Sequence, residues 1–470
     1  MKYKKNVTRE GLIFLYRAQW GVRLIKHVGT NYKKTLKVLK WVIIVMSYLL
    51  MIAIVYFILR SAFDYIMHPW ITEIIKAPPL APVIPYFPKL FGMQEFMPAF
   101  PFTYFLFALA IVAIVHEFSH GIYMVFNKVR IKSTGFAFFG PFMGAFVEQN
   151  DKDMNKLKRS DHMSILGAGV FANIIFGIIF LLIWIGLFYV TFIPSGVPFN
   201  MYSLGPVVVT NITSIAGLNV SSPTNVGLLD LINENDLDIY TTIENEKEEL
   251  EFIKVKTGDD TYFVTEQYLA EQLGNNQSII GLHMDLPAIN NKLRGIIIEV
   301  DGQKISHHEE LINVMKDKKP GQKINIKTNF KGEIESYDIE LAKDDYDEDR
   351  AIIGIMNNKF TLRIDEIISI NWIGMKKANT HYTQRSEFLA FLYGMMFWTF
   401  SINFLVALFN MLPAIVFFFI PVDGGLFFYQ TMLILTKNNK RLSTFIFKLL
   451  SFIINMAFVV MMVVWAIRFF

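Results

Sequence analysis

The chain of 470 residues contains no cysteine. This absence excludes disulfides, a cysteine nucleophile and thiolate metal sites, so any metal must be held by histidine and carboxylate groups. Charged residues are also scarce, at 18% of the chain against the ~25% usual in soluble domains. Hydrophobic residues make up 53%. This composition favours a membrane protein that carries a soluble part.

Acidic residues are nearly missing from the first 40 residues, which carry eleven Lys or Arg and only Glu10. We expect 1–40 to be a basic, cytoplasmic, amphipathic region. Its stretch GLIFLYRAQWGVRLI either lies on the membrane surface or belongs to an ordinary tail. Because basic residues lie beside apolar runs, we expect the lipid bilayer to be a partner and expect no binding to nucleic acid. The first long apolar run begins near Trp41, too deep for a cleavable signal peptide.

Several apolar runs are long enough to cross a bilayer, for which ~20 residues suffice. They predict a polytopic α-helical membrane protein with about six transmembrane segments. The Gly- and Pro-punctuated stretch 131–150 is too broken for a span and predicts a membrane-embedded hairpin. A Pro-rich loop is expected at 77–101. The predicted spans are 41–60, 102–124, 163–193, 387–412, 413–436 and 443–467.

A polar segment with short β-like runs, 195–385, separates a first membrane part, 41–193, from a second, 386–470. By the positive-inside rule the basic N-terminus lies in the cytoplasm and 195–385 lies outside it. The expected location is the cell membrane, as a multi-pass protein. If every apolar block spans, three basic residues near 440 fall outside, so the topology of 413–441 and the C-terminus stays open.

The sequence His116-Glu117-Phe118-Ser119-His120 is an HExxH motif. Residues four apart share a helix face, so both imidazoles can bind one zinc, and Glu117 is placed to act as general base. The motif lies within an apolar span, where ionisable residues are costly and indicate function. The alternative is a buried polar network or proton relay without metal.

A catalytic zinc needs a third protein ligand besides the two histidines. Asp423, in the apolar stretch PVDGG, is the clearest candidate, although Asp-Gly also begins turns. Glycines after it would let the backbone pass close to the metal. Glu148 is the rival ligand, with a structural or substrate-contact role preferred for it. Asn173 and Asn410 also lie at apolar depth, and each either holds a packing contact or binds the substrate and oxyanion.

These motifs together resemble the site-2 protease family of intramembrane zinc metalloproteases. The resemblance is carried by HEFSH at 116–120, GAFVE at 144–148, GAGVFAN at 167–173 and NMLP…VDGG at 410–425. It implies one zinc per chain held by His116, His120 and Asp423, with Glu117 as the base. It also implies a transmembrane protein substrate cut in regulated intramembrane proteolysis.

Two features depart from the family pattern. The nine residues AIVFFFIPV separate Pro413 from Asp423, several more than is usual, so either a longer loop delivers Asp423 or the ligand geometry is altered. Val170 stands where the family commonly has proline. The inserted domain resembles a PDZ domain, best over 286–330, with GPVVVTNI as its first strand and 213–280 as an insertion without an assigned place. PDZ domains bind extended chain ends by strand addition, although a spacer role is also open.

Two other functions remain open at this point. The first is a catalytically inactive, PDZ-bearing membrane scaffold of the same fold, which would apply if Asp423 cannot reach the zinc. The second is an ion-coupled transporter, whose signature would be inverted repeats that we do not find in the sequence. A metalloprotease of another class would need a membrane-embedded glutamate as its third ligand, and Glu148 is the candidate for that role.

Overall fold

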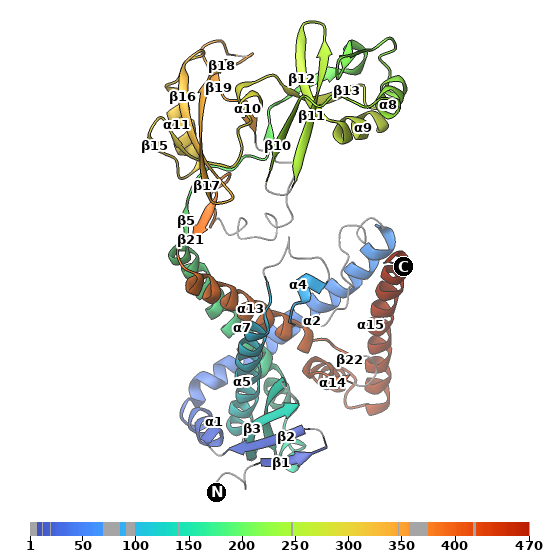
Figure 1. Ribbon diagram of the computed structural model, residues 1–470. Helices are drawn as coiled ribbons and strands as arrows, with labels where there is room; N and C mark the ends of the chain where they lie inside the picture. Colours follow the sequence, from blue (N-terminus) through green and yellow to red (C-terminus); the bar gives the residue numbers. More distant parts are fainter. Residues whose placement is uncertain are drawn as a thin grey trace. The chain divides into compact units, whose positions relative to one another are not determined.

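The computed structural model describes residues 7–11, 13–18, 20–68, 85–90, 99–139, 142–245, 248–345, 347–356, 375–416 and 420–469. The chain forms two compact units. The helical unit comprises Met1–Thr191 and Ser386–Phe470, and the inserted unit comprises Phe192–Arg385 (Figure 1). Most of the expected Pro-rich loop at 77–101 lies outside the described residues.

In the part of the chain that is described, five helices of the helical unit are long and apolar enough to cross a membrane. The chain is therefore a multi-pass membrane protein. The helices are α2 (Lys33–Met67), α5 (Phe102–Phe126), α7 (Arg159–Thr191), α13 (Glu387–Asn410) and α15 (Lys440–Phe469).

The apolar block 413–436 does not form a sixth spanning helix. It contains the two-residue strands β22 (Ile415–Val416) and β23 (Ile420–Pro421), followed by α14 (Asp423–Leu435). At about 1.5 Å per residue α14 extends about 20 Å, less than the ~30 Å hydrocarbon core. The prediction of about six spans is thus corrected to five long helices among the described residues.

The expected hairpin joins the N-terminal region in one antiparallel sheet of order β1-β2-β3-β4. The four strands are β1 (Val7–Glu10), β2 (Ile13–Ala18), β3 (Ile131–Phe139) and β4 (Phe142–Gln149). Helix α1 (Trp20–Asn31) follows β2 and packs against α5. Within the stretch from Gly11 onward the structure therefore has a strand, β2, followed by a helix, α1. A short apolar run such as IFLY fits a strand or a helix equally well, and pairing with β3 decides for the strand.

Helix α7 lies at the centre of the helical unit and packs against α5, α13, α2 and α14. Every residue from Met163 to Ile174 except Phe171 is buried, and most of them are small or apolar. Because α7 contacts both α5 and α14, it connects the HEFSH helix with the helix that begins at Asp423.

The first half of the inserted unit is a seven-stranded antiparallel sheet of order β7-β13-β12-β11-β8-β9, with β10 also paired to β11. The stretch 213–280 supplies most of this sheet, together with helices α8 (Asn225–Glu234) and α9 (Glu266–Gly274). The strands are β7 (Leu204–Val208), β8 (Ser214–Ile215), β9 (Leu218–Asn219), β10 (Thr241–Glu244), β11 (Glu249–Thr257), β12 (Asp260–Thr265) and β13 (Ile279–Met284). GPVVVTNI supplies β7, which pairs with β13 in this sheet.

The second half holds a four-stranded sheet of order β15-β14-β16-β17. The stretch 286–330, where the resemblance to a PDZ domain is best, forms a helix, a strand, a helix and a strand in that order. They are α10 (Pro287–Asn290), β14 (Ile296–Val300), α11 (His308–Lys316) and β16 (Lys323–Phe330), with β15 (Gln303–Lys304) and β17 (Glu333–Glu340) beside them. Short pairs of strands complete the unit: β5 (Phe192–Pro194) with β21 (Tyr382–Gln384), β6 (Met201–Tyr202) with β20 (Ile355–Met356), and β18 (Ala342–Lys343) with β19 (Ala351–Ile352).

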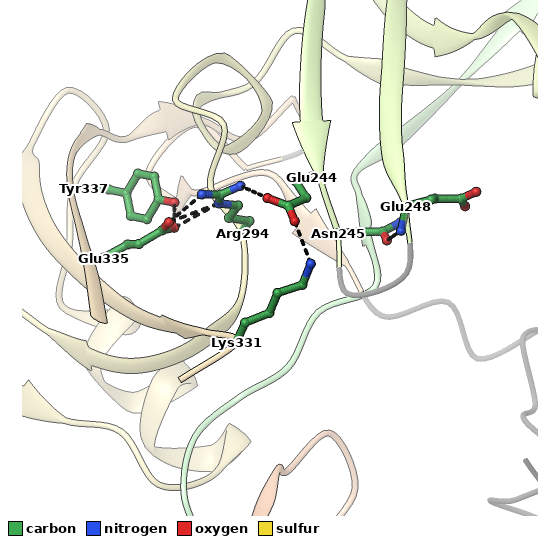
Figure 2. Close-up of polar contacts among 7 residues, drawn as sticks. All are labelled: Glu244, Asn245, Glu248, Arg294, Lys331, Glu335 and Tyr337. Carbon is green, nitrogen blue, oxygen red and sulfur yellow. Dashed lines mark hydrogen bonds and ion pairs between the residues drawn. The ribbon is translucent and has the colours of Figure 1, made fainter. Parts of the chain in front are cut away.

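A cluster of charged side chains joins the two halves of the inserted unit (Figure 2). Arg294 binds Glu335 of β17 through two nitrogens, Nη2 at 2.6 Å and Nε at 3.1 Å, and donates from Nη1 to Glu244 of β10 at 3.0 Å. Lys331 binds the other oxygen of Glu244 at 2.6 Å. Hydrogen bonding from Arg294 holds the pKa of Glu335 below its usual value. Burial and the hydrogen bond to Glu335 raise the pKa of Tyr337 to about 12.

Candidate metal centre

The HEFSH motif lies in the second half of α5, which begins after Pro101 and ends at Phe126. His116 and His120 are both buried and lie one helical turn apart. Their Nε2 atoms are 3.0 Å from each other. The four-residue spacing therefore brings both imidazoles to one point, as the sequence predicted.

Asp423 is the first residue of α14 and comes to the same point from the far end of the chain. Its Oδ2 lies 3.1 Å from Nε2 of His116 and 3.4 Å from Nε2 of His120. The side chains of the two histidines are 10% and 9% exposed and that of Asp423 is 21% exposed. Within the described residues these three groups form a cluster able to hold a metal ion.

The long spacing before Asp423 is taken up by the hairpin of β22 and β23, in which Ile415 pairs with Pro421. The chain leaves α13, forms this hairpin and returns to begin α14. Gly424 is required there, because a Cβ at this position would lie 2.2 Å from the carbonyl carbon of Met411. The glycine after Asp423 thus allows close contact with the loop that follows α13, and this contact fixes where α14 begins.

Residues of helix α7 spaced four apart contact both imidazoles. The Nδ1 of His120 donates to the carbonyl oxygen of Ile165 at 2.7 Å. The amide of Asn173 lies 3.1 Å from Nδ1 of His116. Between them, a Cβ on Gly169 would lie 2.5 Å from Nε2 of His120 and 2.8 Å from His116. Only glycine leaves room at the point where the ligand atoms meet.

The residues present fit a zinc ion. Tetrahedral zinc with bonds of about 2.0–2.2 Å places neighbouring ligand atoms roughly 3.3 Å apart. The three separations among His116, His120 and Asp423 are 3.0, 3.1 and 3.4 Å. Two imidazoles and one carboxylate leave a fourth position open, as catalytic zinc sites require.

Three other residues named from the sequence are not part of the His116–His120–Asp423 cluster. Glu148 is on β4, where it accepts a hydrogen bond from Ser133 at 2.8 Å and lies 3.8 Å from Arg17. It is outside the metal cluster, so the rival assignment of Glu148 as third ligand is wrong. Glu117 is half-buried and rotated about 100° from His116 around α5. Asn410 is the last residue of α13, and its role stays a prediction.

Sequence reasoning did not identify Ile165 and Gly169 as supports of the site. A carbonyl oxygen carries no side-chain signal, so Ile165 could not have been found from residue type. Gly169 does carry one, because it lies four residues before Asn173 within GAGVFAN and shares a helix face with it.

The long apolar helices and the His–His–Asp cluster define a membrane-spanning metallopeptidase. Residues 104–462 match the family model described as Peptidase family M50. The chain therefore belongs to this family of zinc metallopeptidases, which includes the site-2 proteases. A search of the curated proteins finds no match to the chain.

Proposed function

We propose that the chain is a zinc-dependent intramembrane endopeptidase that cleaves a transmembrane segment of another membrane protein. The observation that carries this proposal is the convergence of His116, His120 and Asp423 from two helices of the helical unit. The nitrogen and oxygen atoms lie at zinc-ligand spacing. Asp423 lies within 3.4 Å of both histidines despite the long preceding loop, which supports an active protease over a catalytically inactive scaffold.

His116, His120 and Asp423 would hold the zinc, which supplies Lewis acidity and a nucleophile at neutral pH. Glu117 acts as general base and then returns the proton to the leaving amine. Asn410, at the end of α13 and next to the loop that contacts Gly424, is the residue we assign to the oxyanion or the substrate backbone.

The substrate must be unwound before cleavage, because a helix engages its carbonyl groups in internal hydrogen bonds. Among the described strands β4 lies at the edge of its sheet, with β3 as its neighbour, and a free edge accepts an extended chain. β4 also packs on α5. A Cβ on Gly121, next to His120, would lie 3.3 Å from Val147 of β4. An added strand would therefore run beside the HEFSH helix.

For orientation we propose a cytoplasmic N-terminus and an extracytoplasmic inserted unit, in accord with the basic residues of 1–40 and 124–162. We assign a PDZ-like role to the half that contains α10, β14, α11 and β16, which would select substrates after a first cut has removed an outer domain. The order of these elements supports the assignment.

The test compares zinc content and cleavage of a transmembrane reporter in detergent for the wild type and three variants. Wild type should hold about one zinc per chain and cleave. Glu117→Gln should keep zinc and lose cleavage by about 10²-fold or more. Asp423→Ala should lose zinc. Glu148→Gln, the matched carboxylate control, should keep zinc. A wild type without zinc, or undiminished zinc in Asp423→Ala, would contradict the proposal.

A further inference from the structure

Asn173 is completely buried, with a relative exposure of 0%. Its Nδ2 lies 3.1 Å from Nδ1 of His116. Its Oδ1 has no hydrogen-bond partner in the described structure. A buried acceptor without a donor costs free energy and needs an explanation.

The neighbouring ring shows what this contact should be. His120 donates from Nδ1 to the carbonyl of Ile165, which leaves the lone pair of its Nε2 free toward Asp423. For His116 to present the lone pair of Nε2 to the same point, its Nδ1 must also carry the hydrogen. An Nδ1–H needs an acceptor, whereas the Nδ2 of an amide is a donor.

The two ends of an asparagine amide have nearly the same shape, and their assignment follows from the hydrogen-bond network. Rotating the amide by half a turn brings Oδ1, the atom left without a donor, to Nδ1 of His116. Both rings are then held in the same way by α7, one by the Ile165 carbonyl and one by the Asn173 side chain.

We propose that Asn173 is a positioning residue: its Oδ1 accepts a hydrogen bond from Nδ1 of His116 and directs Nε2 toward the metal. This inference rests on the proposed function, because it concerns the same zinc site. It replaces the oxyanion or substrate role suggested for Asn173 from the sequence. The side chain is fully buried and contacts Nδ1 of His116, whereas Asp423 lies at Nε2, the atom that would hold the metal.

The experiment measures zinc affinity in the full-length protein by competition with a chromophoric chelator. Asn173→Leu keeps the side-chain size and removes the acceptor, so zinc should bind about 10–100-fold more weakly. Asn173→Asp keeps an acceptor and should bind zinc nearly as tightly as wild type. The matched control is Asn403→Leu. Asn403 is equally buried and also has an Oδ1 without a partner, but its Nδ2 donates to Thr399.

Three results would overturn the inference. Asn173→Leu could bind zinc as tightly as wild type, which would leave the ligand set and the proposed function intact. Asn173→Asp could lose as much affinity as the leucine variant, as expected if Nδ2 were the atom facing Nδ1. Asn403→Leu could lose as much as Asn173→Leu, which would assign the loss to packing. The aspartate result decides the matter even if the leucine variant fails to fold.

The absorption spectrum of the Co²⁺-substituted protein provides a readout independent of cleavage. Asn173→Asp should keep the ligand-field bands of wild type, because the same three ligands remain in place, whereas Asn173→Leu should shift or weaken them. Identical spectra for wild type and the leucine variant would count against a positioning role. A wild type that binds neither Zn²⁺ nor Co²⁺ would overturn the proposed function and this inference together.

Discussion

The helical unit and the inserted unit each hold a cluster of polar side chains that joins segments distant in the sequence. In the inserted unit, Arg294 and Lys331 face Glu244 and Glu335 (Figure 2). Each cation there has a carboxylate partner, and the side chains are between 24% and 49% exposed. The charges balance within the cluster.

The cluster of the helical unit is built in the opposite way. His116, His120 and Asp423 bring two ring nitrogens and a carboxylate oxygen to one point, and the histidine side chains are about one-tenth exposed. With both Nδ1 atoms used as donors, the atoms that meet are all acceptors, and a cation is needed among them. The comparison separates two uses of clustered polar side chains. In the inserted unit the cations and carboxylates pair with one another, so the cluster stabilises the fold. In the helical unit the acceptor atoms have no cation among them, so the cluster can bind a metal ion.

The largest effect we expect from a small substitution is at Gly169. In Gly169→Ala the new methyl group would lie 2.5 Å from Nε2 of His120, so the rings must move apart and zinc affinity should fall by about 10²-fold or more. The matched control is Gly186→Ala on the same helix, where a Cβ meets nothing within 4 Å. Zinc affinity should be unchanged in the control. Equal zinc binding by both variants would show that the ligand atoms do not meet where the structure has them.

Much of this site could be predicted from the sequence, because ionisable residues are rare at apolar depth. His116 and His120 follow from helical spacing, and Asp423 from the lack of a competing carboxylate nearby. The position of Asn173 behind His116 could not be predicted. Its helix face follows from the sequence, but which side of the ring it contacts depends on how α5 and α7 pack.

The fold was predictable to a similar extent. Five spanning helices follow from long apolar runs, whereas α14 belongs to an equally apolar block and is shorter because the β22–β23 hairpin uses part of it. The pairing of β2 with β3 joins residues more than a hundred positions apart, and nothing local in IFLYRA specifies it. The sheet formed by 213–280 was also missed. Its strands β8 and β9 have only two residues each, and β11, although nine residues long, is rich in charged residues.

A smaller effect, on stability alone, is expected from Arg294→Met in the inserted unit. The substitution removes the bidentate bond to Glu335 and the bond to Glu244. Both carboxylates, which are only partly exposed, then lose the hydrogen bonds from Arg294. For a partly exposed network the loss should be about 1–2 kcal/mol, measured by thermal unfolding of the full-length protein. Zinc content should not change. A loss of zinc would show that this cluster is not a purely structural one.

The same variant has a pH signature. The pKa values of Glu335 and Glu244 are held below normal, chiefly by hydrogen bonds from Arg294 and Lys331 respectively. A lowered folded-state pKa contributes stability above the unfolded value, which is about 4.3 for glutamate, and that stability is lost as the pH falls below it. The stability difference between wild type and Arg294→Met should therefore be constant above about pH 5 and shrink in acid. A difference that stays constant into acid would mean that the ion pairs do not stabilise the fold.

The smallest effect is expected at Lys331, which has an exposed side chain and pairs with Glu244 alone among the acids of Figure 2. Water and salt screen such a pair, so Lys331→Met should cost no more than about 0.5 kcal/mol. Since Arg294 and Lys331 share Glu244, their effects should not add, and the double variant should unfold at nearly the same temperature as Arg294→Met. Strict additivity in this double-mutant cycle would show that the two cations act separately. The cluster would then be a set of isolated surface pairs, and its contrast with the histidine–carboxylate cluster would be one of exposure alone.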